Sequence, residues 1–171
     1  MPQAMIEKIN KLKKDRHAII LAHNYQIPEV QDIADFHGDS LELSRIAARS
    51  EAKAVVFCGV HFMAEVADIM TAPHQKAILP DLAAGCSMAD MANLAKVERC
   101  WRELNEVLNA EEEVTPVTYI NSAADLKAFC GEHGGIVCTS SNAGTIAQWA
   151  FERRSKVLFF PPFSNLIISV P

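Results

Sequence analysis

The cysteine thiol of residue 86 lies between a short apolar run and a long amphipathic segment. Cys86 lies in the glycine-containing stretch Pro80–Met88. Ser87 and Asp90 have the spacing of a capping box, which predicts that Cys86 lies just outside a helix N-terminus. Backbone N–H groups and the helix dipole at such a position favour a thiolate, the form of cysteine that ligates metals. The pattern also fits a half-buried structural cysteine in a glycine turn, and the local sequence leaves both readings open.

The other cysteines do not complete a metal site by local spacing. The chain has five cysteines, an odd number without a C-x-x-C pair, so we do not expect disulfides. Cys58 and His61 have a C-x-x-H spacing, but the apolar run before Cys58 favours burial. A four-coordinate zinc site cannot be assembled from neighbouring residues in this sequence.

Polar side chains follow four of the apolar runs. Ligands of open parallel sheets bind beyond the carboxyl ends of the strands, so we expect a binding site there. The Ser140 hydroxyl and the N–H groups that open the following helix predict an anion pocket. A turn former or a helix cap is the alternative role for a lone Asn or Ser at such a position. The polar runs are 23–26 and 119–122 after the first strand of each half, and 58–61 and 138–142 after the second.

Short Val- and Ile-rich runs alternate with helical patterns in both halves of the chain. Each half predicts a βαβαβ order, and the first half also carries a helix over 40–49 with Asp39 and Glu42 spaced as a cap. The fold class is therefore α/β, with repeated three-layer αβα units around short parallel sheets. We expect a first domain over 1–88 and a second, incomplete domain over 89–171 with an atypical tail over 162–171. The predicted strands are 18–22, 54–58, 76–79, 116–120, 135–138 and 156–160.

Composition and charge exclude several classes of protein. The 171 residues are 50% hydrophobic and 22% charged, which is typical of a globular protein with a substantial core. A formal charge of -5 without a basic stripe argues against nucleic acid as a partner. The sequence has no apolar run long enough for a membrane span and no secretory signal pattern, so we expect no membrane association and a cytoplasmic location. The glycine-rich phosphate motifs and the G-x-S-x-G elbow are also absent.

Six runs, in the same order along the chain, closely resemble the quinolinate synthase family. The resemblance extends to about Phe160 or Pro161 and covers about the first half of a family member. The six runs are 22–26, 38–41, 56–65, 80–89, 118–122 and 138–143.

The resemblance implies an enzyme of NAD biosynthesis, a pyridine nucleotide pathway. Quinolinate synthases are transferases that condense iminoaspartate with dihydroxyacetone phosphate, using an oxygen-sensitive 4Fe-4S cluster. The family fold implies three similar α/β domains around a pseudo-threefold axis, each supplying one cysteine ligand, so that the fourth iron stays open as a Lewis acid. A functional link to L-aspartate oxidase is implied as well.

The resemblance also assigns roles to individual positions. The metal ligand is Cys86; the substrate-binding residues are His23 and Ser40 in the first domain and Tyr119, Asn121 and Ser140 in the second; the catalytic acid/base candidates are Tyr25 and His23.

The end of the chain departs from the family pattern. After Pro161 the family continues with an Asp-Gln-His-Leu-Gly type of sequence, whereas residues 162–171 read differently. We therefore expect a truncated or frameshifted chain without the other two cluster cysteines, and Cys138 does not stand at a ligand position. Such a chain is predicted to be inactive alone. The alternative is a non-catalytic anion-binding α/β fragment.

Overall fold

The computed structural model describes residues 1–160 in full and the backbone of residues 166–169. The predicted atypical tail over 162–171 therefore lies outside the described residues, apart from that short backbone segment. Contacts divide the chain into two compact units, Met1–Gly85 and Cys86–Pro171. Each unit is described by itself below.

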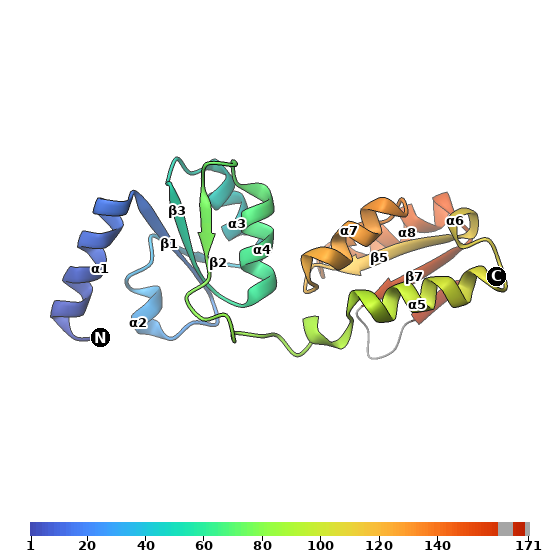
Figure 1. The fold of residues 1–171 in the computed structure, drawn as a ribbon, viewed down its shortest axis with the longest axis horizontal. Helices are drawn as coiled ribbons and strands as arrows, with labels where there is room; N and C mark the ends of the chain where they lie inside the picture. Colours follow the sequence, from blue (N-terminus) through green and yellow to red (C-terminus); the bar gives the residue numbers. More distant parts are fainter. Residues whose placement is uncertain (161–165, 170–171) are drawn as a thin grey trace. The chain divides into compact units, whose positions relative to one another are not determined.

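The first unit is a four-stranded parallel sheet with helices on both faces (Figure 1). The strand order is β2-β1-β3-β4. The predicted strands at 18–22, 54–58 and 76–79 are confirmed within one residue, and the predicted helix over 40–49 is confirmed. The elements are α1 Gln3–Arg16, β1 Ala18–His23, α2 Pro28–Gln31, β2 Phe36–Gly38, α3 Ser40–Arg49, β3 Ala54–Cys58, α4 His61–Met70 and β4 Lys76–Ile78.

The second unit repeats this topology with the order β6-β5-β7-β8. Its first three strands are parallel, as predicted, whereas β8 is antiparallel to β7. The elements are the 3-10 helix η1 Ala89–Met91, α5 Leu94–Asn105, α6 Ala110–Glu113, β5 Val114–Tyr119, α7 Ala124–Glu132, β6 Ile136–Cys138, α8 Ala143–Arg153, β7 Lys156–Phe160 and β8 Leu166–Ser169. The predicted α/β class with parallel sheets and αβα layers is confirmed.

The strand order explains which helices share a face. In a right-handed crossover, the face of the sheet on which the connecting helix lies depends on the direction in which the chain moves along the sheet. Helices of crossovers that run in opposite directions therefore lie on opposite faces. The step from β1 to β2 runs one way and the steps through β3 to β4 run the other way. In agreement, α1 and α2 lie on one side of the first sheet and α3 and α4 lie on the other (Figure 1).

The second sheet carries apolar side chains on both faces, as expected for a covered parallel sheet. Leu158 and Phe160 of β7 pack with α5 and α7, whereas Val157 and Phe159 pack on the side of α8. The same alternation along β5 places Tyr119 on the α8 side. The face of the sheet on which Tyr119 lies therefore follows from the period of the strand.

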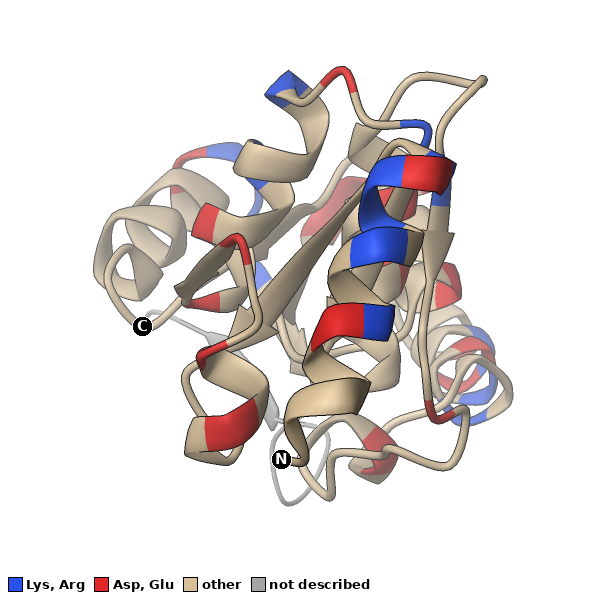
Figure 2. Ribbon diagram, turned by 90° about the vertical axis from the view of Figure 1, so that its left-hand side faces the viewer, with Lys and Arg blue, Asp and Glu red and all other residues tan. Residues whose placement is uncertain are grey.

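The first three strands of the first unit carry no charged residues. Strands β1, β2 and β3 contain no Lys, Arg, Asp or Glu, and Figure 2 shows the charged positions on the surrounding helices and loops. Among the described residues, no helix combines the length and apolar character needed to cross a membrane.

Two adjacent glycines let β6 approach β5. Gly134 has a φ of 70°, in the left-handed region that favours glycine. A Cβ on Gly135 would lie only 1.9 Å from the carbonyl oxygen of Pro116 in β5. A side chain at position 135 would therefore push β6 away, and with it the loop that carries Ser140.

The predicted capping box at Ser87 and Asp90 is wrong. Residues 89–91 form a single 3-10 turn without a side-chain cap, and the long helix α5 starts only at Leu94. Its cap is Asn93, whose side-chain oxygen accepts the Lys96 N–H at 3.0 Å. Cys86 is thus separated from the N-terminus of α5, and a helix dipole does not act on its sulfur in the predicted way.

This correction can be tested with a pair of substitutions. Asn93→Ala removes the acceptor at the start of α5 and is expected to cost about 1 kcal/mol of unfolding free energy. Ser87→Ala is the matched control and should change stability little. Urea unfolding followed by tryptophan fluorescence suits the test, because Trp101 and Trp149 both lie in the second unit. An equal loss in both variants would contradict the assignment of the cap.

Candidate functional site

The carboxyl ends of β1 and β2 bring three predicted site residues to one edge of the first unit. His23 ends β1 and pairs in register with Gly38, the last residue of β2. Ser40 opens α3 two residues later and is half-buried. Tyr25 lies just beyond His23 and its side chain is 85% exposed.

The His23 ring is held in one orientation. The backbone N–H of Tyr25 donates to Nδ1 at 3.2 Å, and the two rings lie 4.2 Å apart at 58°. Because Nδ1 accepts this bond, the neutral imidazole carries its proton on Nε2. Burial lowers the pKa of His23, and the charge of Asp39 opposes that effect. The ring is thus a largely buried imidazole with one nitrogen committed to the backbone.

The start of α3 is fixed by side chains. Asp39 caps the helix, as predicted, by accepting the Glu42 N–H at 2.8 Å. The Ser44 hydroxyl donates to the carbonyl oxygen of Ser40 at 2.7 Å. The position of Ser40 therefore depends on a cap and on a second hydrogen bond one turn further along.

The second unit brings its predicted residues to the equivalent edge. The Tyr119 hydroxyl at the end of β5 is hydrogen-bonded to the Ser140 hydroxyl in the loop before α8. Asn142 closes that loop, because its side-chain oxygen accepts the Thr139 N–H at 2.7 Å. Asn121, two residues beyond Tyr119, is half-buried. The α8 helix itself begins at Ala143, three residues after Ser140.

Strand register shows how the residues of the two units correspond. His23 pairs with Gly38, and Tyr119 pairs with Cys138. Position by position, His23 corresponds to Tyr119, Tyr25 to Asn121, and Ser40 to Ser140. The predicted equivalence of the strands that end at Cys58 and Cys138 is wrong, because β6 occupies the place of β2 in the sheet order.

Cys86, the predicted metal ligand, opens the second unit as a half-buried thiol. The Asn121 side-chain amide donates to its sulfur at a distance of 3.9 Å. The Cys86 carbonyl oxygen accepts the Asp90 N–H at 2.9 Å. Cys86 and Asn121 are therefore neighbours within the second unit, at the edge that also carries Tyr119.

Three of the other thiols have pKa values that burial raises. Burial raises the pKa of Cys130 to about 12, and it also raises the pKa values of Cys58 and Cys138. Thiols of this kind are poor ligands and nucleophiles at neutral pH. His61, which shares the C-x-x-H spacing with Cys58, has its Nδ1 3.4 Å from a carboxylate oxygen of Glu65.

The described residues do not form a complete metal site. Within residues 1–160, no three His, Cys, Asp or Glu side chains gather in an arrangement that could hold a metal ion. Cys86 fits the role of one cluster ligand because its thiol is accessible and has a polar neighbour. The other ligands that a cluster needs are not supplied by this part of the chain.

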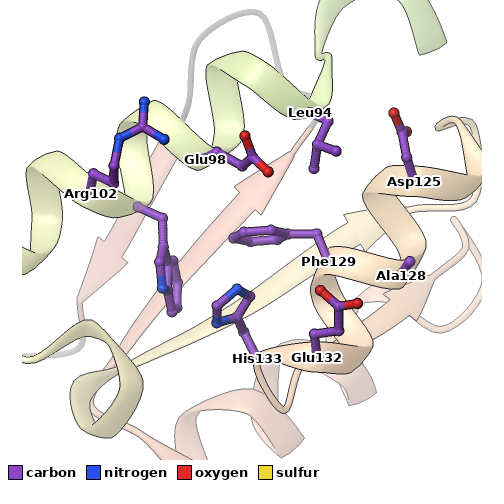
Figure 3. A pocket seen from close by; sticks show the side chains of 9 residues that line it. Leu94, Glu98, Arg102, Asp125, Ala128, Phe129, Glu132 and His133 are labelled. Atoms are coloured by element: carbon purple, nitrogen blue, oxygen red, sulfur yellow. The ribbon is translucent and has the colours of Figure 1, made fainter.

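A cavity of about 390 Å³ lies between α5 and α7, away from all of the predicted site residues (Figure 3). Its wall is a structural cluster. One carboxylate oxygen of Glu111 accepts from Trp101 Nε1 at 3.1 Å and lies 2.6 Å from His133 Nδ1. The rings of Trp101, Phe129 and His133 pack against one another. These residues hold α5 and α6 onto α7.

The comparisons with known proteins agree with the resemblance inferred from the sequence. The family model described as "Quinolinate synthetase A protein" matches residues 7–166. The chain belongs to the quinolinate synthase family. It is 60% identical over 144 residues to the quinolinate synthase of Corynebacterium glutamicum. The aligned region covers 84% of this chain and 36% of that relative. It is 53% identical over 170 aligned positions to the quinolinate synthase of Rhodopirellula baltica. That alignment covers 93% of this chain and 43% of the relative.

The chain thus spans less than half the length of these quinolinate synthases. Sequence reasoning assigned the candidate site residues to the strand ends but did not connect the charge of Asp39 with His23. The spacing of Asp39 and Glu42 predicted Asp39 only as a helix cap. Its proximity to His23 follows only from strand β2, which the three-residue sequence Phe-His-Gly does not reveal.

Thiol alkylation provides a direct test of the cysteine environments. We expect iodoacetamide at neutral pH to modify Cys86 before Cys58, Cys130 and Cys138, because burial keeps those three thiols protonated. Peptide mass spectrometry after timed labelling gives the order, and the urea-unfolded chain is the control in which all sites react. Labelling of Cys130 as fast as Cys86 in the folded chain would contradict this picture.

Proposed function

We propose that this chain contributes the first two domains of a quinolinate synthase, which condenses iminoaspartate with dihydroxyacetone phosphate to quinolinate. In this proposal, residues 1–88 and 89–171 are the two αβα domains. The observation that carries it is the equivalent placement of His23 and Ser40 in one unit and Tyr119 and Ser140 in the other, in a chain that belongs to this family.

The polar groups suit the charges of the two substrates. Iminoaspartate carries two carboxylates and dihydroxyacetone phosphate carries a phosphate, so both need hydrogen-bond donors. Hydroxyl groups of Ser40, Tyr119 and Ser140 and the amide of Asn121 supply such donors at the strand ends. Charge-assisted hydrogen bonds to anionic oxygens are the stronger kind, so neutral donors of this type suit anionic substrates.

His23 and Tyr25 are the acid/base candidates. The condensation and dehydration need a proton taken from carbon and a proton given to a departing hydroxyl. With Nδ1 committed to the Tyr25 backbone, His23 exchanges protons at Nε2. The exposed Tyr25 phenol is proposed to donate a proton to a substrate oxygen. Burial of His23 keeps the imidazole neutral near neutral pH, the form that accepts a proton.

The family cofactor is a 4Fe-4S cluster, for which Cys86 would be one ligand. When bound, the cluster supplies a Lewis-acidic iron that polarises substrate oxygen atoms. The described residues do not complete its ligand set, so a polypeptide of these 171 residues is proposed to hold no stable cluster and to make no quinolinate alone.

A complementation experiment tests this proposal. The chain is co-expressed with the C-terminal part of the Corynebacterium glutamicum relative, purified without oxygen and reconstituted with iron and sulfide. We expect a cluster and quinolinate formation from the pair and neither from the chain alone. Cys86→Ser should abolish both the visible absorbance of the cluster and the activity, whereas Cys100→Ser, on α5, is the matched control.

Two results would contradict the proposal. A stable cluster with turnover in the isolated chain would show that the other ligands are not needed. Full activity of the Cys86→Ser pair would show that this thiol is not a ligand. Calorimetry of the isolated chain with dihydroxyacetone phosphate examines the alternative: binding without any activity of the complemented pair would favour an anion-binding fragment.

A further inference from the structure

We propose that the outer edge of β7 is a docking site for a strand of the polypeptide that completes this fold, and that β8 occupies this site in the chain itself. The segment Leu166–Ser169 then competes with a complementing polypeptide for one row of backbone hydrogen-bonding groups. The competition rests on the proposed function, whereas the pairing of β8 with β7 does not.

The first unit shows such an edge completed by a parallel strand. There β4 is the outermost strand, and it pairs in parallel with β3. The connection over residues 59–75 contains α4, the kind of crossover helix that parallel pairing requires. The repeat of the topology in the second unit therefore predicts a parallel strand beside β7, delivered by a crossover of its own.

The second unit differs from the first directly after β7. The outermost strand β8 takes the place of β4 in the sheet order, but it runs antiparallel. Only residues 161–165 separate β7 from β8 along the sequence. Parallel strands need a connection of about a dozen residues or more, so a connection this short returns the chain antiparallel. Thus β8 is a hairpin strand and not the counterpart of β4.

The register shows that β8 and β4 cover equivalent positions. The first residue of β1 pairs with Ala54, and the first residue of β5 pairs with Lys156. These two residues are therefore the equivalent first positions of β3 and β7. The first three residues of β3 pair with β4, and the first four residues of β7 pair with β8. Every position of β3 that β4 covers thus has an equivalent in β7 that β8 covers.

One strand edge cannot hold two partners at once. The other edge of β7 is paired with β5. An open strand edge presents N–H and C=O groups that recruit a strand from another chain. The quinolinate synthases named above are more than twice as long as the region aligned with this chain, so they contain polypeptide that can supply such a strand. While β8 is paired, it protects the edge and excludes that strand.

A pair of proline substitutions in the full chain tests whether β8 is paired. Adjacent residues of an antiparallel edge strand direct their N–H groups to opposite sides, so only one residue of a neighbouring pair donates to β7. We expect one of Ile167→Pro and Ile168→Pro to speed hydrogen exchange over residues 156–159 and to lower the urea midpoint of the second unit. The other variant is the matched control and should behave like the unchanged chain.

Two measurements read the result. Hydrogen exchange is followed by peptide mass spectrometry, with the peptide that covers β1 in the first unit as the internal reference. Urea unfolding is followed by the fluorescence of Trp101 and Trp149, which both lie in the second unit. Equal effects of the two prolines on β7, or unchanged exchange of β7 in both variants, overturn the pairing.

Binding to a complementing fragment tests the competition. The fragment is the part of the Corynebacterium glutamicum relative that starts directly after the residue aligned with Phe160, so that it includes whatever strand follows β7. We expect the proline variant that frees β7 to bind this fragment with a lower Kd than the unchanged chain. The control proline variant should match the unchanged chain. Surface plasmon resonance gives the three Kd values.

The outcomes separate this inference from the proposed function. The same Kd for all three chains overturns the competition. Tighter binding by the freed variant, together with a reconstituted pair that makes no quinolinate, supports the docking site and contradicts the proposed function.

Discussion

The parallel pairing of the first two strands in each unit is the constraint on which the site depends. In-register pairing of β1 with β2, and of β5 with β6, brings the ends of strands that are separated in sequence to the same edge. A shift of one residue would turn every side chain of a strand to the opposite face. The hydrophobic faces of the sheets forbid such a shift, so the core sets the positions of His23, Ser40, Tyr119 and Ser140.

The two edges are alike in geometry and differ in electrostatics. The first combines a buried imidazole with a carboxylate held by a helix cap, and the second combines a phenol, an amide and hydroxyl groups. A low local dielectric strengthens hydrogen bonds and raises the cost of unpaired charge. The proposed function assigns proton transfer to the first edge and the binding of anionic groups to the second.

The parts of the fold that sequence could predict are those with a strong period or a specific side-chain signal. The apolar runs predicted β1, β3, β4, β5, β6 and β7, and the spacing of Asp39 and Glu42 predicted the cap of α3. Strand β2 escaped prediction because Phe36–Gly38 is too short to show an alternation, and the equivalence of β6 with β2 was missed with it. The Ser87 cap was wrong because Asn93 competes for the same role and stands directly before α5.

His23 and Tyr25 are two residues apart, yet the structure exposes them very differently. His23 is 6% exposed and Tyr25 is 85% exposed. Replacing the Tyr25 phenol removes an exposed side chain and its ring contact with His23, whereas replacing the imidazole also disturbs the interior. In a population of variants, natural selection for protein abundance would act on position 23 but scarcely on position 25. Any evolutionary constraint on the tyrosine would then reflect its chemistry and its contact with the His23 ring more than the packing of the core.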